Sequence, residues 1–137
     1  MTSITGLSHV ALTVSDLDRS QSWYEKVLNA ATLFRARVDA YGFECAYLAE
    51  PVSGLLIGLT QHDDAATARP FDARTTGLDH LSFAVSERAE LERWAEHLDS
   101  AGIAHNGVVD QPFGTGLELQ DPDGIALEFY HLVLPNA

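Results

Sequence analysis

The chain has 137 residues and a mass of 14.9 kDa, a length at which one ordinary domain is expected. Hydrophobic residues make up 46% and charged residues 20% of the chain, which excludes a disordered protein and a coiled coil. Its 8 Lys and Arg residues stand against 20 Asp and Glu residues, giving a net charge of −12. This charge disfavours nucleic acids and anionic membrane surfaces as partners.

The single cysteine, Cys45, excludes an intramolecular disulfide and any zinc or redox site built from cysteine pairs. The first residues contain no basic segment followed by an apolar stretch, and no apolar run approaches the length of a membrane span. We therefore expect a cytoplasmic protein without a membrane partner.

The sequence repeats itself. GLSHVALTVS at 6–15 aligns with GLDHLSFAVS at 77–86, and the same offset that joins His9 to His80 also joins Trp23 to Trp94. Because His and Trp are rare residue types, their joint recurrence indicates two copies of one module. A duplicated module can serve packing alone, so the repeat does not by itself indicate a functional site.

Each copy opens with residues that alternate between two faces, the pattern of a half-buried strand. In the first copy Val10, Leu12 and Val14 share one face, and His9 lies on the opposite face. In the second copy His80 likewise lies opposite the aliphatic residues. Both histidines are therefore predicted on the sheet face that points away from the helices.

A helix is predicted after each opening strand. Ser15-Asp16 and Ser86 offer side-chain oxygens that can cap a helix N-terminus. The second helix has the clearer apolar stripe, which Gly102 is placed to end. The members of this stripe are Leu91, Trp94, Ala95, Leu98 and Ala101. A shorter stripe in the first helix consists of Trp23, Val27 and Leu28.

Three short strands are expected after each helix. In the first half they fall near Thr32–Val38, Phe43–Leu48 and Leu55–Thr60, and in the second half near Ala104–Val109, Gly116–Leu119 and Ile125–Tyr130. The run Asp-Pro-Asp-Gly before the last strand is a strong turn signal, because Pro fixes φ and Gly accepts a positive φ. Each module is thus predicted as β-α-β-β-β.

The predicted fold class is α+β, with two tandem βαβββ modules in a single domain that spans 1–137. Module one covers about 5–61, a linker without periodicity about 62–75, and module two about 76–133.

Glu128 interrupts the apolar last strand, where alternation places it on one face with Ala126 and Tyr130. A carboxylate on a central strand is costly unless it meets a cation, a proton or several donors, and the alternative is an edge strand that faces water. Two imidazoles and one carboxylate, from His9, His80 and Glu128, would form a three-ligand face for a divalent metal and leave positions open for water or substrate.

The stretches at 7–12, 78–83 and 121–130 resemble the paired units of the vicinal oxygen chelate superfamily. This superfamily includes glyoxalase I, extradiol dioxygenases, fosfomycin-resistance proteins and bleomycin-resistance proteins. The resemblance covers nearly the whole chain, and its most specific part is the Asp-Pro-x-Gly turn that leads into the strand of Glu128. It implies curved mixed sheets that form a cup, with His9, His80 and Glu128 as the metal ligands.

The chain departs from some members of this superfamily. Gly58 aligns with Glu128, so the first module lacks the carboxylate that glyoxalase I commonly supplies as a fourth ligand. His62 or a water is an alternative there, although His62 is expected in the linker. Fosfomycin-resistance proteins tend to carry a Thr where this chain has Ala11, and no basic cluster suits a phosphonate. Bleomycin-resistance proteins commonly lack the metal triad.

The resemblance therefore implies a metal-dependent enzyme that binds a small substrate through vicinal oxygens, either dioxygenase-like or an isomerase or lyase. Fe(II) is the first metal expected, and Mn, Co, Ni or Zn are also allowed. The alternative is a non-catalytic protein that sequesters a small molecule. A homodimer is implied as well, with the site formed within one chain or shared between two.

Several further side chains are candidates for the site. Tyr130, on the face of Glu128, is a candidate general acid, with packing as its alternative. The residues of the third strand that share one face, and so can line the cavity, are Phe43, Cys45 and Tyr47. Phe113 and Gly114-Thr115-Gly116 are expected to form a lip.

Overall fold

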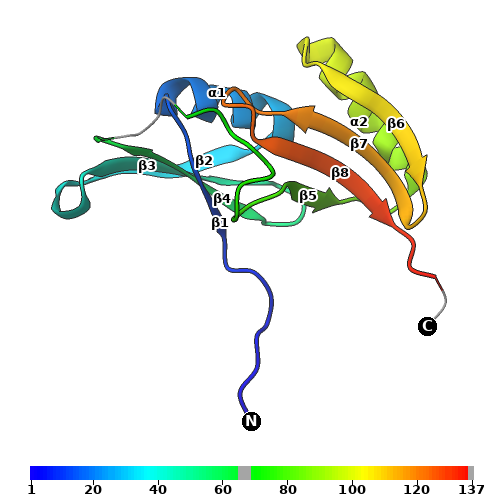
Figure 1. Cartoon of the computed structure of the whole chain (residues 1–137), viewed down its shortest axis with the longest axis horizontal. Helices are drawn as coiled ribbons and strands as arrows, with labels where there is room; N and C mark the ends of the chain where they lie inside the picture. The colour runs from blue at the N-terminus through cyan, green and yellow to red at the C-terminus, as the bar shows by residue number, and fades with distance from the viewer. Residues whose placement is uncertain (65–68, 136–137) are drawn as a thin grey trace. The chain divides into compact units, whose positions relative to one another are not determined.

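The structure is a computed structural model, and it describes residues 1–64 and 69–135. The chain divides into two compact units, Met1–Arg69 and Pro70–Ala137, each with one α-helix and one four-stranded sheet (Figure 1). Positions 65–68 of the expected linker lie outside the described residues.

The first unit contains β1 (Val10–Thr13), α1 (Leu17–Leu28), β2 (Ala31–Val38), the 3-10 helix η1 (Asp39–Tyr41), β3 (Phe43–Ala49) and β4 (Leu56–His62). The second unit contains β5 (Leu81–Ala84), α2 (Arg88–Ala101), β6 (His105–Gln111), β7 (Gly114–Gln120) and β8 (Ala126–Leu132). The predicted β-α-β-β-β order is confirmed in both units, and within the described ranges no helix is long and apolar enough to cross a membrane.

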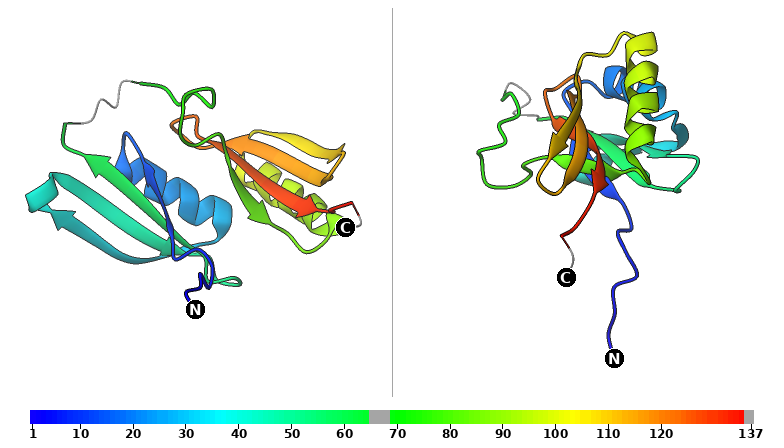
Figure 2. Two further views of the ribbon diagram at one scale, coloured as in Figure 1. Left: turned by 60° about the horizontal axis from the view of Figure 1, so that its bottom comes forward. Right: turned by 90° about the vertical axis from the view of Figure 1, so that its right-hand side faces the viewer.

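The two sheets have the same topology, with strand orders β1-β4-β3-β2 and β5-β8-β7-β6. In each sheet the first strand pairs in parallel with the last, and the other pairs are antiparallel. The ribbon views in Figure 2 show each sheet with its own helix against one face. The predicted α+β class with mixed sheets is therefore confirmed.

The N-terminus of α1 is fixed by two side chains. The Asp16 carboxylate caps the helix by accepting from the Arg19 N–H at 3.0 Å, as predicted. From β4, the Gln61 side-chain oxygen accepts from the Leu17 N–H at 2.7 Å. The centre of the buried stripe differs from the prediction, since Tyr24 is fully buried and not its neighbour Trp23.

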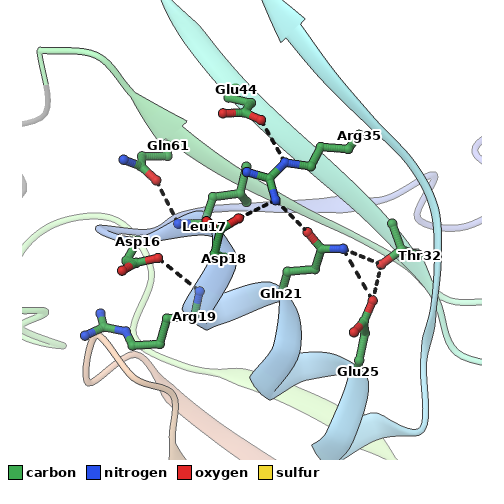
Figure 3. Close-up of polar contacts among 10 residues, drawn as sticks. All are labelled: Asp16, Leu17, Asp18, Arg19, Gln21, Glu25, Thr32, Arg35, Glu44 and Gln61. Carbon is green, nitrogen blue, oxygen red and sulfur yellow. Dashed lines mark hydrogen bonds and ion pairs between the residues drawn. The ribbon is translucent and has the colours of Figure 1, made fainter.

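A polar cluster joins α1 to β2 (Figure 3). The Thr32 hydroxyl donates to the Glu25 carboxylate and accepts from the Gln21 side-chain nitrogen at 3.0 Å. Further along β2, the Arg35 guanidinium lies 2.5 Å from the carboxylate of Asp18 in the first turn of the helix. These contacts fix both ends of α1 against the edge strand.

The second helix packs through Leu91 and Leu98, which are fully buried, and ends at Gly102 with a φ of 71°. The predicted C-terminal end of this helix at Gly102 is confirmed. The predicted N-cap Ser86 is wrong, because the helix begins one residue later behind Glu87, and no side chain caps it.

The face of each sheet away from its helix is called the open face here. In the first sheet, Ala46, Leu48 and Leu59 are fully buried on the helix side. The residues that alternate with them along β3 and β4 therefore lie on the open face. The expected lip is wrong in part, since Gly114–Gly116 belongs to β7 and only Phe113 lies in the preceding turn.

Candidate metal centre

Two of the three predicted metal ligands meet within the second unit. His80 directly precedes β5, and Glu128 lies in β8 opposite Ser82. The Nε2 atom of His80 is 3.2 Å from Oε1 of Glu128. The Glu128 side chain is 13% exposed and that of His80 47%, so the pair is accessible from solvent on the imidazole side. This contact is consistent with the sequence prediction that the two side chains lie at one site.

Asp79 orients the imidazole of His80. Its Oδ1 atom lies 2.6 Å from Nδ1 of His80, and because a carboxylate only accepts, Nδ1–H is the donor. This hydrogen bond, together with the charges of Glu128 and Asp79, raises the pKa of His80 above its ordinary value, although partial burial acts in the opposite direction. The result is a fixed ring whose Nε2 faces Glu128, an arrangement typical of ligating histidines.

His9 has an equivalent neighbour in the first unit. The Ser8 hydroxyl lies 3.0 Å from Nδ1 of His9, so each histidine has a polar side chain directly before it that reaches its Nδ1 atom. Sequence reasoning missed both of these orienting residues. The signal was present, because Ser8 and Asp79 align in the repeat.

The ring of His9 packs edge-on against Tyr47 of β3, with ring centroids 5.4 Å apart. Tyr47 also stacks on Phe34 of β2, with ring centroids 5.1 Å apart and an interplanar angle of 16°. Phe43, Cys45 and Tyr47 are paired with alternate residues of β4, which confirms that the three share one strand face. An aromatic surface therefore adjoins the first predicted ligand.

The registers of the two sheets make Gly58 the equivalent of Glu128. Gly58 is paired with Ala11 in the parallel β1–β4 ladder, as Glu128 is paired with Ser82 in the β5–β8 ladder. The first unit therefore has no carboxylate at the corresponding place.

His62 is the last residue of β4, not a linker residue, and its ring packs on Phe43 at 5.6 Å. It lies four residues beyond Gly58, about 13 Å along the strand. His62 therefore lies apart from the place that corresponds to Glu128, and its role as an alternative fourth ligand stays a prediction.

Tyr130 lies on the open face, as predicted, but its ring extends over β7. A Cβ atom added at Gly116 would lie 2.9 Å from Cδ2 of Tyr130, and one added at Gly114 would lie 3.0 Å from Cε1. Because Glu118, not Gly114, is opposite Glu128, the ring extends away from the carboxylate. A role of Tyr130 as general acid stays a prediction.

The donor set of the second unit is one imidazole and one carboxylate, both suitable for a divalent metal. Within residues 1–64 and 69–135, no cluster of three or more His, Cys, Asp or Glu side chains has the geometry of a complete metal site. His9 is the remaining predicted donor, and it belongs to the first unit. The second unit therefore supplies two of the three expected donors by itself.

The strands provide little positive charge for an anionic ligand. Their only Lys or Arg residues are Arg35 and Arg37, and both are paired with carboxylates. Arg35 lies 2.7 Å from Glu44, and Arg37 lies 2.5 Å from Asp63. The sheets therefore offer no unpaired guanidinium to a phosphonate or phosphate.

Comparisons with known proteins agree with this architecture. The family model described as the Glyoxalase/Bleomycin resistance protein/Dioxygenase superfamily matches residues 6–129. The crystal structure of a glyoxylase/bleomycin resistance protein/dioxygenase domain from Frankia sp. EAN1pec is 41% identical, covers 95% of this chain and 99% of its own, and has a TM-score of 0.85. The chain belongs to this superfamily, as its resemblance to vicinal oxygen chelate proteins indicated.

Two other relatives carry a more specific name. The metallothiol transferase FosB of Bacillus licheniformis is 28% identical over 134 residues, with 93% of this chain and 75% of that protein covered. A fosfomycin resistance protein FosX from Listeria monocytogenes, solved as a point mutant with Mn(II) and 1S,2S-dihydroxypropylphosphonic acid, has a TM-score of 0.70. It is 20% identical, with 96% of this chain and 95% of that chain covered, and it shows a shared fold.

Proposed function

We propose that this protein is a metal-dependent enzyme that binds a small substrate through two vicinal oxygen atoms, with His9, His80 and Glu128 as the metal ligands. The observation that carries the proposal is the 3.2 Å approach of His80 Nε2 to Glu128 Oε1 beside the open face. Membership of the superfamily and the orienting contact from Asp79 support it.

A divalent metal at this site supplies Lewis-acid stabilisation of negative charge on the chelating oxygens. The other tasks belong to side chains of this protein. Asp79 and Ser8 hold the imidazoles of His80 and His9, and the Glu128 carboxylate contributes negative charge to the site. We assign Tyr130 as the residue that donates a proton to the substrate.

Fe(II) is the metal we propose first, and a dioxygenase-like reaction, or an isomerase or lyase reaction, is the chemistry. Two histidines and one carboxylate form the ligand set that leaves one metal face open to a bidentate substrate and dioxygen. Mn(II), Co(II), Ni(II) and Zn(II) also fit this ligand set, and the metal found decides which reaction class is assayed.

The relationship to the metallothiol transferase FosB favours a second candidate, metal-dependent transfer of a thiol, with fosfomycin, for which the FosX protein of shared fold is named, as the phosphonate substrate to test. The pairing of Arg35 and Arg37 with carboxylates argues against it, because a phosphonate needs free cationic donors. Fosfomycin with a low-molecular-weight thiol therefore belongs in the assay panel as the competing substrate. Turnover of fosfomycin would replace the first proposal with the second.

Elemental analysis of protein purified without chelators or a His tag tests the ligand set. We expect about one divalent metal per chain in the wild type, and loss of that metal in Glu128→Gln, His80→Ala and His9→Ala. His62→Ala is the matched control, because this imidazole lies on the same sheet as His9 but packs on Phe43. Wild-type protein that stays metal-free after reconstitution would overturn the metal proposal and favour the non-catalytic binding alternative, which ligand-binding screens would then test.

We also propose a homodimer, and the same variants decide whether its site is shared. Light scattering after gel filtration measures the mass in solution. If His9 and Glu128 of one site come from different chains, mixing His9→Ala with Glu128→Gln protein restores one intact site per heterodimer. If they come from one chain, the mixture stays metal-free.

A further inference from the structure

The phenol of Tyr47 occupies the space above Gly58. A Cβ atom added at Gly58 would lie 2.9 Å from Cζ of Tyr47, 3.0 Å from Cε1 and 3.2 Å from the hydroxyl oxygen. The two residues are directly opposite each other on β3 and β4. A side chain at position 58 and the present position of the Tyr47 ring therefore exclude each other.

This space corresponds to the place of a carboxylate in the second unit. There the equivalent cross-strand pair is Glu118 and Glu128, and Glu128 is the residue that meets His80. In the first unit the shorter residue, Gly58, allows the longer one, Tyr47, to lie across it. The phenol of Tyr47, whose ring packs against His9, thus lies above Gly58 at the place that corresponds to the Glu128 carboxylate of the second unit.

Two contacts hold the ring in this position. The His9 ring lies at a steep angle to the Tyr47 ring, and Phe34 stacks on Tyr47 from β2. The register of β2 shifts between Thr32 and Phe34, and this bulge pairs Phe34 directly with Tyr47. The bulge therefore has a specific result, because it moves the stacking ring onto the open face.

The Tyr47 hydroxyl has no hydrogen-bond partner among the described residues. A neutral phenol offers one donor and one acceptor, and Tyr47 is only half-buried. Its ring contacts two other rings, those of His9 and Phe34, so the donor is positioned before any ligand arrives. Such a preorganised group loses little freedom when it forms a hydrogen bond.

We propose that Tyr47 positions the substrate by donating a hydrogen bond from its hydroxyl to a substrate oxygen beside His9. Gly58 is required because it leaves room for the phenol. This inference rests on the proposed function, since it takes His9 to be a metal ligand. It adds a substrate contact from the first unit that is distinct from Tyr130 in the second.

The test uses Co(II) as the metal and acetohydroxamic acid as a probe with two vicinal oxygens. We expect Tyr47→Phe to bind Co(II) with the stoichiometry and visible spectrum of the wild type, and to bind acetohydroxamate about tenfold more weakly. Gly58→Ala retains the phenol but displaces it, so a similar weakening is expected. Tyr41→Phe removes a hydroxyl from η1, outside the sheet, and should change neither quantity.

The possible results distinguish the role of Tyr47 from the proposed metal site. Equal acetohydroxamate affinity in Tyr47→Phe and wild type, with Co(II) bound by both, would overturn the role of Tyr47 and leave the metal proposal intact. Loss of Co(II) from Tyr47→Phe would also overturn it, because the residue would then support the metal and not the substrate. Wild-type protein that binds no Co(II) would overturn the proposed function and this inference with it.

Discussion

The carboxylate of Asp121 accepts a hydrogen bond from the backbone N–H of Ile125 at 2.8 Å. The same oxygen accepts from the N–H of Asp123 at 2.9 Å, and Asp121 is only 5% exposed. Gly124, with a φ of 80°, completes the turn. Asp121 thereby fixes where the chain enters β8, the strand that carries Glu128.

Replacement of Asp121 by Ala should lower the free energy of unfolding by about 1–3 kcal/mol, because two N–H groups lose a buried acceptor. Chemical denaturation followed by fluorescence measures the change. Asp121→Asn keeps an oxygen in the same place and should lose less. Equal losses in the two variants would show that the hydrogen bonds to this oxygen are not the stabilising contact.

Gly114 is required at the start of β7. Its φ is +147°, and an added Cβ atom would lie 2.0 Å from the carbonyl oxygen of His131. We expect Gly114→Ala to destabilise the protein by more than about 2 kcal/mol, because backbone strain and a clash act together. Gly77→Ala is the control, since Gly77 has a φ of +143° and nothing within 4 Å of an added Cβ. Thermal unfolding of both variants separates the clash from the strain.

The Thr32 hydroxyl should contribute measurably to the attachment of α1. Thr32→Val preserves shape but removes the donor to Glu25 and the acceptor for Gln21. We expect a loss of about 1 kcal/mol in the free energy of unfolding. Thr13→Val, at an exposed position of β1, should be nearly neutral. If the two variants unfold alike, the cluster shown in Figure 3 does not stabilise the helix.

The turn between β3 and β4 should make stability depend on pH through Glu50. Burial raises the pKa of its carboxyl, but hydrogen bonds from the Ser53 hydroxyl and from the Ser53 and Val52 N–H groups outweigh this and lower it below the ordinary 4.5. The stabilisation is therefore present above the unfolded pKa and lost as the pH falls through the lower folded value.

Comparison with Glu50→Gln isolates this contribution. At pH 7 we expect the variant to have a lower Tm than the wild type, because it lacks the charge that the donors stabilise. As the pH falls below 4.5 and through the lowered pKa of the folded state, the two melting temperatures should approach each other, since the wild-type carboxyl becomes protonated. A Tm difference that does not shrink as the pH is lowered would contradict the assignment to Glu50.

The sequence predicted the fold well because the repeat doubled each signal. The Asp16 cap and the Gly102 end of α2 follow from local chemistry that acts within one turn of helix. The strand ends were less accurate: β4 continues to His62 because pairing with Phe43 extends the ladder beyond the predicted end at Thr60. Such extension is a property of the neighbouring strand and not of the local sequence.

The site was predictable only in part. Period-two alternation put Glu128 and His80 on one side of their sheet, in agreement with their contact, because alternation depends on backbone geometry alone. The direction of the Tyr130 ring and the position of Tyr47 were not predictable, since each depends on a glycine in the neighbouring strand. The bulge that pairs Phe34 with Tyr47 was not predictable either, because the register depends on both strands.

The parallel pairing of the first and last strands also governs when the site can form during synthesis. Val10–Thr13 leaves the ribosome long before its partner Leu56–His62 exists, and Leu81–Ala84 likewise waits for Ala126–Leu132. Contacts between segments so far apart in the chain carry a high loop-closure cost and are associated with slow folding. Because Glu128 lies on the final strand, a nascent or truncated second unit presents His80 without its carboxylate.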